Sequence, residues 1–349
     1  MRADDGLAEL LGHEIPPPEA TRKFLYQFHD AERIEAAQEQ RALGQVAYIP
    51  GENAALRGLG EVNRDLIRVL GQRCPEQKIA TVDEDATIIS RKREALPTYE
   101  GERGYQPMLA VWAETNVVLA EEFRDGNVPA LMDPLNVAKR AFAALPVTVE
   151  TRYFRGDSAC HESRLVNWLR DEKREEGPPG FIGFGIGARM SEGLHAALLA
   201  VVPEAWQADG EEADVVRECA EVVYVPSEKN EKKDQQPLRY VGIRWRKRQG
   251  ELFGDGTGVK HFAVVSNIWE WSAPRLLEWQ RQKAGTIEIV HDAQERVGGG
   301  GAAVCSIRSE CGVAAPSGAG AQRDDGVEET GAAARVVVGA TEAPALPDL

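Results

Sequence analysis

The sequence predicts an α/β protein in which helices pack on a sheet. Three β-rich apolar segments follow one another at 78–89, 108–112 and 116–120, and the apolar residues then change to helical spacing over 133–145. A further short strand is predicted at 151–155, and acidic residues end both the first and the last strand. This order of three strands, a helix and a strand favours an α/β sheet with a polar site along its carboxyl edge.

Residues 1–75 are predicted to form an N-terminal helical region. Its clearest pattern is a helix over 56–71 whose apolar residues recur on one stripe. The stripe consists of Leu59, Val62, Leu66, Val69 and Leu70. The period changes after this helix, so we place the first part of the α/β domain at 76–180.

The second half of the chain divides into three further segments. Residues 181–268 are mostly β in pattern, with charged loops between the strands, and 269–296 returns to helical spacing. The last segment, 297–349, has 22 Gly or Ala among its 53 residues and none of the chain's 23 aromatic residues. Such a composition cannot supply a packed core, so we predict that this tail is disordered.

Composition limits the classes of function. The net charge of −15 argues against indiscriminate binding to nucleic acid or to an anionic membrane. No apolar run reaches the roughly 18–20 residues of a membrane span, and the N-terminus lacks a secretory pattern, so we expect a cytoplasmic protein without a membrane partner. The five scattered cysteines are typical of reduced thiols.

One local basic run has two interpretations. Trp245 lies among four cations in the run Arg244 to Arg248. Cations for phosphates beside an aromatic side chain for a base are typical of a nucleic-acid surface. The alternation that leads into the run equally favours an edge strand with one solvated face.

Three acids are candidates for a shared metal site. Asp85 ends the first strand, Asp157 follows a later strand, and Glu288 lies within the last helix. Divalent cations such as Mg²⁺ need several oxygen ligands, and phosphoryl transfer uses one or two such ions, about 3.5–4 Å apart when paired. Asp83 is the alternative first ligand, because it shares a strand face with Asp85.

The sequence around these acids resembles a known family. The blocks are Val82-Asp83-Glu84-Asp85-Ala86-Thr87, Tyr105-Gln106-Pro107, Phe123-Arg124-Asp125-Gly126-Asn127-Val128-Pro129, Arg155-Gly156-Asp157-Ser158 and Lys283-Ala284-Gly285-Thr286-Ile287-Glu288-Ile289-Val290-His291-Asp292. In this order they resemble the DDE transposases of bacterial insertion sequences, specifically the insertion-sequence-1380-like group, over roughly residues 5–292. The resemblance implies an RNase H-like mixed sheet with helices and a β-rich insertion before the last catalytic acid.

The resemblance also implies a site and its partners. Asp85, Asp157 and Glu288 would be the catalytic acids, and with Asp83 as the alternative they would hold two Mg²⁺ or Mn²⁺ ions. The partners would be double-stranded DNA, at the ends of the insertion sequence and at the target, and a second copy in an active homodimer. The ions would activate water to cut a phosphodiester and then align the freed 3′-hydroxyl with target DNA, without a covalent enzyme intermediate.

The chain departs from the family pattern near the last acid. Related transposases have an Arg four residues before the Glu and a Lys seven after it, which hold DNA phosphates, whereas this chain has Ala284 and Glu295. Lys283 is adjacent to the first position and is a candidate substitute. A carboxylate at 295 would repel a phosphate.

A change of reading frame accounts for this departure. Permitted codons for the tail, read one base later, restore a Lys seven residues after Glu288 and an amphipathic run. We therefore predict that residues after about 292 are translated out of frame, and that the chain also starts late. Two alternatives remain open, namely a remnant without enzymatic activity that at most binds DNA or a full-length homologue, and an RNase H-like nuclease without strand transfer.

Overall fold

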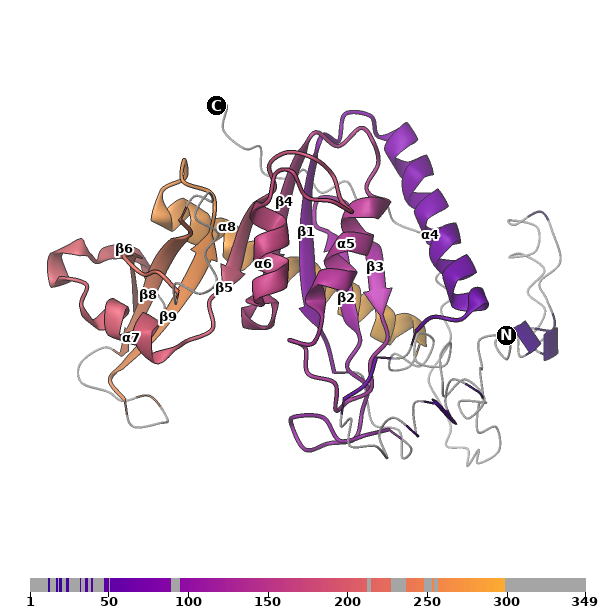
Figure 1. Cartoon of the computed structure of the whole chain (residues 1–349), viewed down its shortest axis with the longest axis horizontal. Helices are drawn as coiled ribbons and strands as arrows, with labels where there is room; N and C mark the ends of the chain where they lie inside the picture. The colour runs from indigo at the N-terminus through magenta and orange to yellow at the C-terminus, as the bar shows by residue number, and fades with distance from the viewer. Residues whose placement is uncertain are drawn as a thin grey trace, which may run out of the picture.

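The structure is a computed structural model of the whole chain (Figure 1). It describes residues 51–88, 95–211, 215–226, 237–247 and 257–298, together with isolated positions before 50 and at 253. Within the last helix, the side chains at 288, 289 and 291–298 lie outside the description. The predicted disordered tail beyond 298 also lies outside the described residues.

A large mixed sheet organises the described part of the chain, with helices on both faces. Its strand order is β3-β2-β1-β4-β5-β9-β8-β7-β6. The strands are β1 (Ile79–Ala86), β2 (Met108–Trp112), β3 (Val117–Glu122), β4 (Thr151–Gly156), β5 (Gly183–Gly187), β6 (Gln207–Glu211), β7 (Val215–Val222), β8 (Arg239–Lys247) and β9 (Val259–Ser266). The protein is therefore α/β, as the sequence predicts.

The two halves of the sheet differ in strand direction. β1, β2 and β3 form an antiparallel meander, while β4 is parallel to β1 and β5 is parallel to β4. Beyond β5, the strands from β9 to β6 are antiparallel throughout. The predicted β-rich segment 181–268 thus begins with a strand that extends the parallel part, and its remaining strands lengthen the same sheet.

Five helices are described in full or in large part. Three of them begin where a side chain accepts backbone hydrogen bonds: Asn53 caps α4, Glu162 caps α6 and Ser191 caps α7. The fourth, α5, has proline at its first position, which suits that site because a proline lacks the amide hydrogen. The helices are α4 (Ala54–Arg73), α5 (Pro134–Ala144), α6 (Ser163–Arg170), α7 (Glu192–Leu199) and α8 (Ala273–Gly298).

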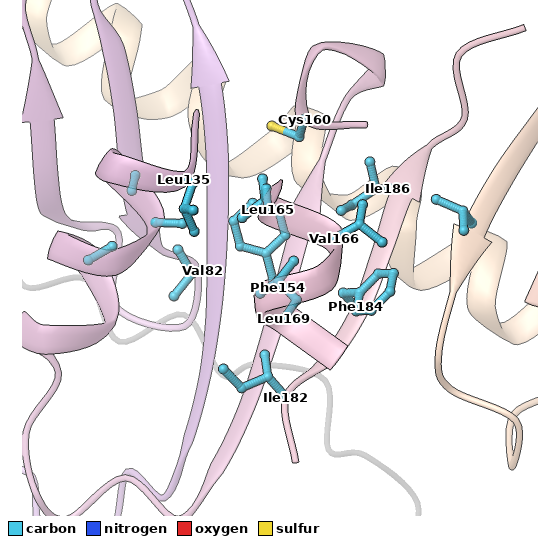
Figure 2. Packing of buried hydrophobic residues seen from close by; sticks show 14 of the residues in the cluster. Val82, Leu135, Phe154, Cys160, Leu165, Val166, Leu169, Ile182, Phe184 and Ile186 are labelled. Atoms are coloured by element: carbon cyan, nitrogen blue, oxygen red, sulfur yellow. The ribbon is translucent and has the colours of Figure 1, made fainter. Parts of the chain in front are cut away.

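The main core lies between the sheet and the helices α5 and α6 (Figure 2). Val82 and Phe154 of the central strands pack there with Leu135 and Leu165 of the helices. The opposite face of the sheet is crossed by α8, whose Leu276 and Leu277 pack on β8 and β9, and whose Ile287 packs on β2. The central strands β1 and β4 are therefore covered on both faces, although Asp83, Glu84 and Arg155 lie among their buried side chains.

The helix α4 buries a different face from the stripe that the sequence singled out. Leu59, Val62, Leu66 and Val69 are exposed, whereas Ile67 and Gly71 are buried. Leu70, the last residue of the predicted stripe, is partly buried against the core. Gly71 allows the close approach, because an added Cβ would lie 2.4 Å from the Cβ of Pro146. The side chain of Asn63 also donates a hydrogen bond to the carbonyl oxygen of Val118, which ties α4 to the edge strand β3.

None of the helices in the described part is long and apolar enough to cross a membrane. The edge-strand interpretation of the basic run is wrong, because β8 lies between β7 and β9 and pairs with both along its length.

Two glycines of α4 provide a matched test of this packing. We expect Gly71→Ala to lower the free energy of unfolding by about 1–3 kcal/mol, because the new methyl group overlaps Pro146. Gly60→Ala should raise it by about 0.5–1 kcal/mol, because no atom lies near its Cβ position and alanine favours a helix. Urea unfolding followed by circular dichroism measures both, and a stabilising Gly71→Ala would contradict the described packing.

Candidate active site

Two of the predicted acids meet at the carboxyl edge of the sheet. Asp85 is the penultimate residue of β1, and Asp157 directly follows β4. The two strands run parallel in a register that pairs Glu84 with Gly156. The residue that follows each member of this pair in the sequence is one of the two acids. The Asp157 carboxylate also accepts a hydrogen bond of 2.9 Å from the amide of Ala159, which fixes the short turn after β4.

Both acids line the same open cleft. Its larger part has a volume of about 640 Å³ and its smaller part about 390 Å³, and Asp85 and Asp157 line both parts. The motif blocks of the sequence gather around them. The larger part is lined among others by Gln106, Gly126, Asn127, Val128 and Pro129, and the smaller part by Gln280, Arg281, Lys283, Ala284 and Ile287.

The loop that lines the larger part is held by a buried arginine. Arg124 is fully buried, and its guanidinium binds the carboxylate of Glu122 and the carbonyl oxygens of Ala130 and Asp133. Gly126 lies at a point where an added Cβ would be 2.4 Å from the carbonyl oxygen of Gly104. These contacts give the Arg-Asp-Gly-Asn block a structural role, which is to shape one wall of the cleft.

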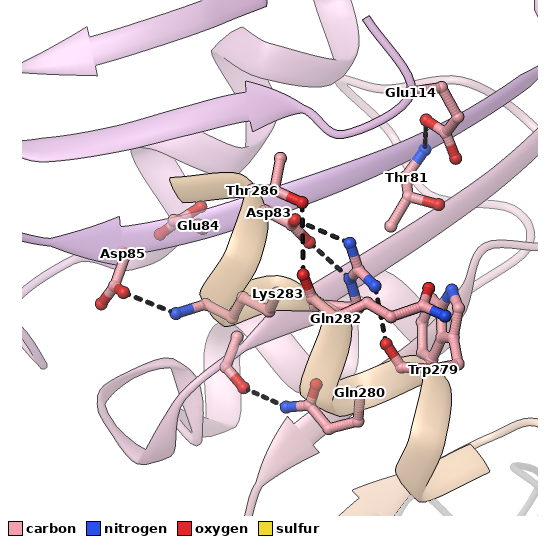
Figure 3. A network of polar contacts seen from close by, with 12 residues as sticks. Thr81, Asp83, Glu84, Asp85, Glu114, Trp279, Gln280, Gln282, Lys283 and Thr286 are labelled. Atoms are coloured by element: carbon pink, nitrogen blue, oxygen red, sulfur yellow. Dashed lines mark hydrogen bonds and ion pairs between the residues drawn. The ribbon is translucent and has the colours of Figure 1, made fainter. Parts of the chain in front are cut away.

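Two hydrogen bonds place α8 against the site, and they involve its residues Trp279 and Gln280 (Figure 3). Arg155 of β4 donates a hydrogen bond of 2.6 Å to the carbonyl oxygen of Trp279. The side-chain amide of Gln280 donates a hydrogen bond of 2.8 Å to the carbonyl oxygen of Gly156. Since Gly156 immediately precedes Asp157, the helix is anchored directly beside the second acid.

Asp83, the alternative first ligand, lies beneath α8 and away from the cleft. Its carboxylate is fully buried and accepts hydrogen bonds of 2.6 and 2.7 Å from Arg155. Burial raises the pKa of Asp83 above its ordinary value, and the guanidinium of Arg155 opposes that shift. Asp83 is fully buried, whereas Asp85 lines the cleft, and this difference in access favours Asp85 as the first ligand.

Lys283 reaches the first acid from α8. Its ammonium lies 2.7 Å from Oδ2 of Asp85, and the residue is only 8% exposed. Burial lowers the pKa of Lys283, but the charge and hydrogen bond of Asp85, together with the charge of Asp157, raise that pKa above its ordinary value. The pKa of Asp157 is also raised, by partial desolvation and by the charge of Asp85, against the opposing charge of Lys283.

The third acid is described only by its backbone. Glu288 lies in α8, as predicted, one turn after Ala284, which lines the cleft. The side chains of Glu288 and Glu295 lie outside the described residues. Among the side chains that are described, no three His, Cys, Asp or Glu residues gather closely enough to hold a metal ion.

The donor chemistry of the two described acids fits a hard divalent ion. Asp85 and Asp157 present carboxylate oxygens to one cleft, and such oxygens are the ligands that Mg²⁺ and Mn²⁺ prefer. The position of Lys283 shows independently that a cation is stabilised at this carboxylate pair. Among the described side chains, Asp85 and Asp157 are thus the groups of this cleft whose chemistry suits such an ion.

Glu84 is a buried acid that the sequence did not single out. Its carboxylate lies on the opposite face of β1 from Asp83 and Asp85, and neither oxygen has a hydrogen-bond partner among the described residues. Burial raises the pKa of Glu84 well above its ordinary value, although the charge of Arg124 opposes the shift. The alternation of side chains along a strand predicts on which face of the sheet such a residue lies, but it does not predict whether other elements bury that face.

The basic run of β8 is divided between two faces of the sheet. Arg244 and Arg246 both bind the carboxylate of Glu218 on the neighbouring strand β7. Trp245 lies on the other face, where the Arg217 guanidinium stacks over its ring at 5.2 Å. Two of the four cations therefore share one carboxylate within the protein, and Arg248 lies outside the described residues.

Comparison of the chain with models of protein families and with curated proteins gave no match. The interpretation of the cleft therefore depends on its own geometry and on the motifs of the sequence.

The buried pair of Asp83 and Arg155 gives a prediction with a pH dependence. We expect Arg155→Met to lower the free energy of unfolding by about 3–5 kcal/mol, because it leaves a buried carboxylate without its cation. The pKa of Asp83 is already raised and would rise further, so the folded variant would bind a proton more tightly than the unfolded one. Its stability should then increase as the pH falls toward the ordinary pKa of an aspartate.

The double variant Asp83→Asn with Arg155→Met is the matched control. It lacks the titrating carboxylate, so we expect partial recovery of stability and loss of that pH dependence. Urea unfolding at several pH values measures both effects. Equal losses for the single and double variants at every pH would contradict the description of this pair.

Proposed function

We propose that the protein is a DDE-type transposase that uses divalent metal ions to cut and join DNA. The observation that supports this most is the meeting of Asp85 and Asp157 in one cleft, although 72 positions separate them in the sequence. The helix that lines the same cleft contains Glu288, the third acid of the proposed set. The three acids thus lie at the end of β1, directly after β4, and in the crossing helix α8.

The strand arrangement supports an RNase H-like catalytic domain. An antiparallel meander is followed by two strands parallel to its first strand, in the order β3-β2-β1-β4-β5. Helices α5 and α6 lie on one face of this half, and α8 crosses the other. The strands from β6 to β9 precede α8 in the chain, as a β-rich insertion before the last acid requires.

The residues of the cleft have distinct parts in the proposed mechanism. Asp85, Asp157 and Glu288 would hold two Mg²⁺ or Mn²⁺ ions, which supply the charge that activates water and stabilises the leaving oxygen of a phosphodiester. Gln280 keeps β4 and α8 together beside Asp157. Arg189 lines the larger part of the cleft and is exposed, so its guanidinium is available for a DNA phosphate. The DNA would be double-stranded, and the active form a homodimer.

Metal-dependent cleavage of DNA tests the proposal. Purified protein with Mg²⁺ or Mn²⁺ should nick supercoiled plasmid DNA, and should join an oligonucleotide with a free 3′-hydroxyl into the plasmid. We expect Asp85→Asn, Asp157→Asn and Glu288→Gln each to reduce both reactions by at least about a thousandfold, because each removes a ligand charge. Gel electrophoresis of the plasmid products measures cleavage and joining.

Asp65→Asn is the matched control, because this exposed acid lies on α4 and only faces Arg68. It should leave both reactions unchanged. Cleavage without joining would indicate a nuclease, and folded protein that cleaves nothing would indicate a remnant without activity. Cleavage that survives Asp157→Asn would refute the proposed site.

A further inference from the structure

The strongest unexplained contact of the cleft is the ion pair between Lys283 and Asp85. It joins residues 198 positions apart, from α8 to the end of β1, and the ammonium lies 2.7 Å from Oδ2 (Figure 3). Lys283 is 8% exposed and the side chain of Asp85 is 30% exposed, so the pair is partly shielded from solvent. A partly buried pair of this kind is not the weak, mobile contact of an exposed surface.

Charge around the ammonium explains why it lies there. Asp85 and Asp157 line the same cleft, so their like charges repel each other unless a cation lies nearby. Arg155 is not the cation that balances these two charges, because its guanidinium is bound to Asp83 and to the carbonyl oxygen of Trp279. Arg281, the other cation of the smaller part, is bound to Asp209 at 2.7 and 3.0 Å. Among the described residues of this part, Lys283 is the one cation that contacts a cleft carboxylate.

We propose that Lys283 is an internal counter-ion that occupies Asp85 in the metal-free protein and competes with the divalent ion for that carboxylate. This inference rests on the proposed function, because it takes Asp85 and Asp157 as the metal site. It adds a regulatory property to that site: a divalent ion binds only when the ammonium gives up its place on Oδ2.

Competition follows from the size and charge of the two cations. A divalent ion such as Mg²⁺ binds a carboxylate oxygen at about 2.0–2.1 Å, so it would approach the oxygen that the ammonium already contacts. Two cations at one oxygen repel each other strongly in a shielded site. The lysine stem has four rotatable carbons, and the adjoining cleft of about 390 Å³ gives the displaced ammonium room to move.

The competing interpretation is that Lys283 only supports the fold. Lys283→Met separates the two, because methionine keeps most of the apolar stem but removes the charge. A purely supporting residue would affect stability when replaced but would not alter metal affinity in the folded protein. A competing counter-ion would weaken metal binding, so its removal would strengthen it.

The experiment is titration of the purified full chain with Mn²⁺, with free ion measured by electron paramagnetic resonance. We expect Lys283→Met to bind Mn²⁺ about tenfold more tightly than the unmodified chain. Lys283→Arg, which keeps the charge, should bind as weakly as the unmodified chain. Circular dichroism confirms that each variant is folded, and Lys283→Gln replaces the methionine variant if that one does not fold.

Arg189→Gln is the matched control for charge alone. This exposed arginine lines the larger part of the cleft, and in the described structure it forms no ion pair with Asp85 or Asp157. Its loss should change Mn²⁺ affinity by less than about twofold, because an exposed charge is screened by solvent.

The outcomes distinguish this inference from the proposed function. Tighter Mn²⁺ binding by Lys283→Met, with little change for Arg189→Gln, supports competition at Asp85. Mn²⁺ binding that is lost in Asp157→Asn but is unchanged or weaker in Lys283→Met refutes the counter-ion and leaves the metal site intact. Absence of Mn²⁺ binding in the unmodified chain and in Lys283→Met refutes both the counter-ion and the metal site.

Discussion

The rest of the structure depends on one buried ion pair that joins three elements. Arg155 of β4 holds the Asp83 carboxylate of β1 and donates a further hydrogen bond to the carbonyl oxygen of Trp279 in α8. A buried polar group without a partner costs about 1–3 kcal/mol, and a buried charge costs more. Sliding β4 along β1, or α8 along the sheet, would break these bonds together. The pair thereby fixes the strand register and the position of the helix at once.

The ion pair between Asp83 and Arg155 gives the two acids on this face of β1 different roles, because Asp83 supports the fold and Asp85 lines the cleft. Asp83 and Asp85 lie on the same face of the strand because side chains alternate with a period of two. The first is covered by α8 and bound by Arg155, whereas the second lies at the strand end, where the helix leaves room for a cleft. The same parallel register that the ion pair fixes brings Asp157 level with Asp85. Two similar carboxylates on one strand thus have different environments because of their distance from the helix.

The sequence predicts the local elements well, because their signals are local. The strands β1 to β4, the helix α5 and the meeting of Asp85 with Asp157 follow from apolar periodicity and from the geometry of parallel strands. The buried face of α4 does not follow, because its burial depends on Pro146, a residue far along the chain. The pairing of Arg244 with Glu218 spans 26 positions and that of Lys283 with Asp85 spans 198, so neighbouring residues contain no sign of either.

The distribution of charge connects the fold to the proposed chemistry. Under the proposed function, a chain with a net charge of −15 would admit a polyanion to a cleft lined by carboxylates. In the smaller part of the cleft, Lys283 is held by Asp85 and Arg281 by Asp209, so both cations are already bound to carboxylates of the protein. A divalent ion at Asp85 would neutralise the carboxylate and release Lys283 in the same step. Under the proposed function, metal binding would therefore add Lys283 to Arg189 as a cation available to DNA phosphates, and the cleft would attract DNA more strongly once the metal has bound.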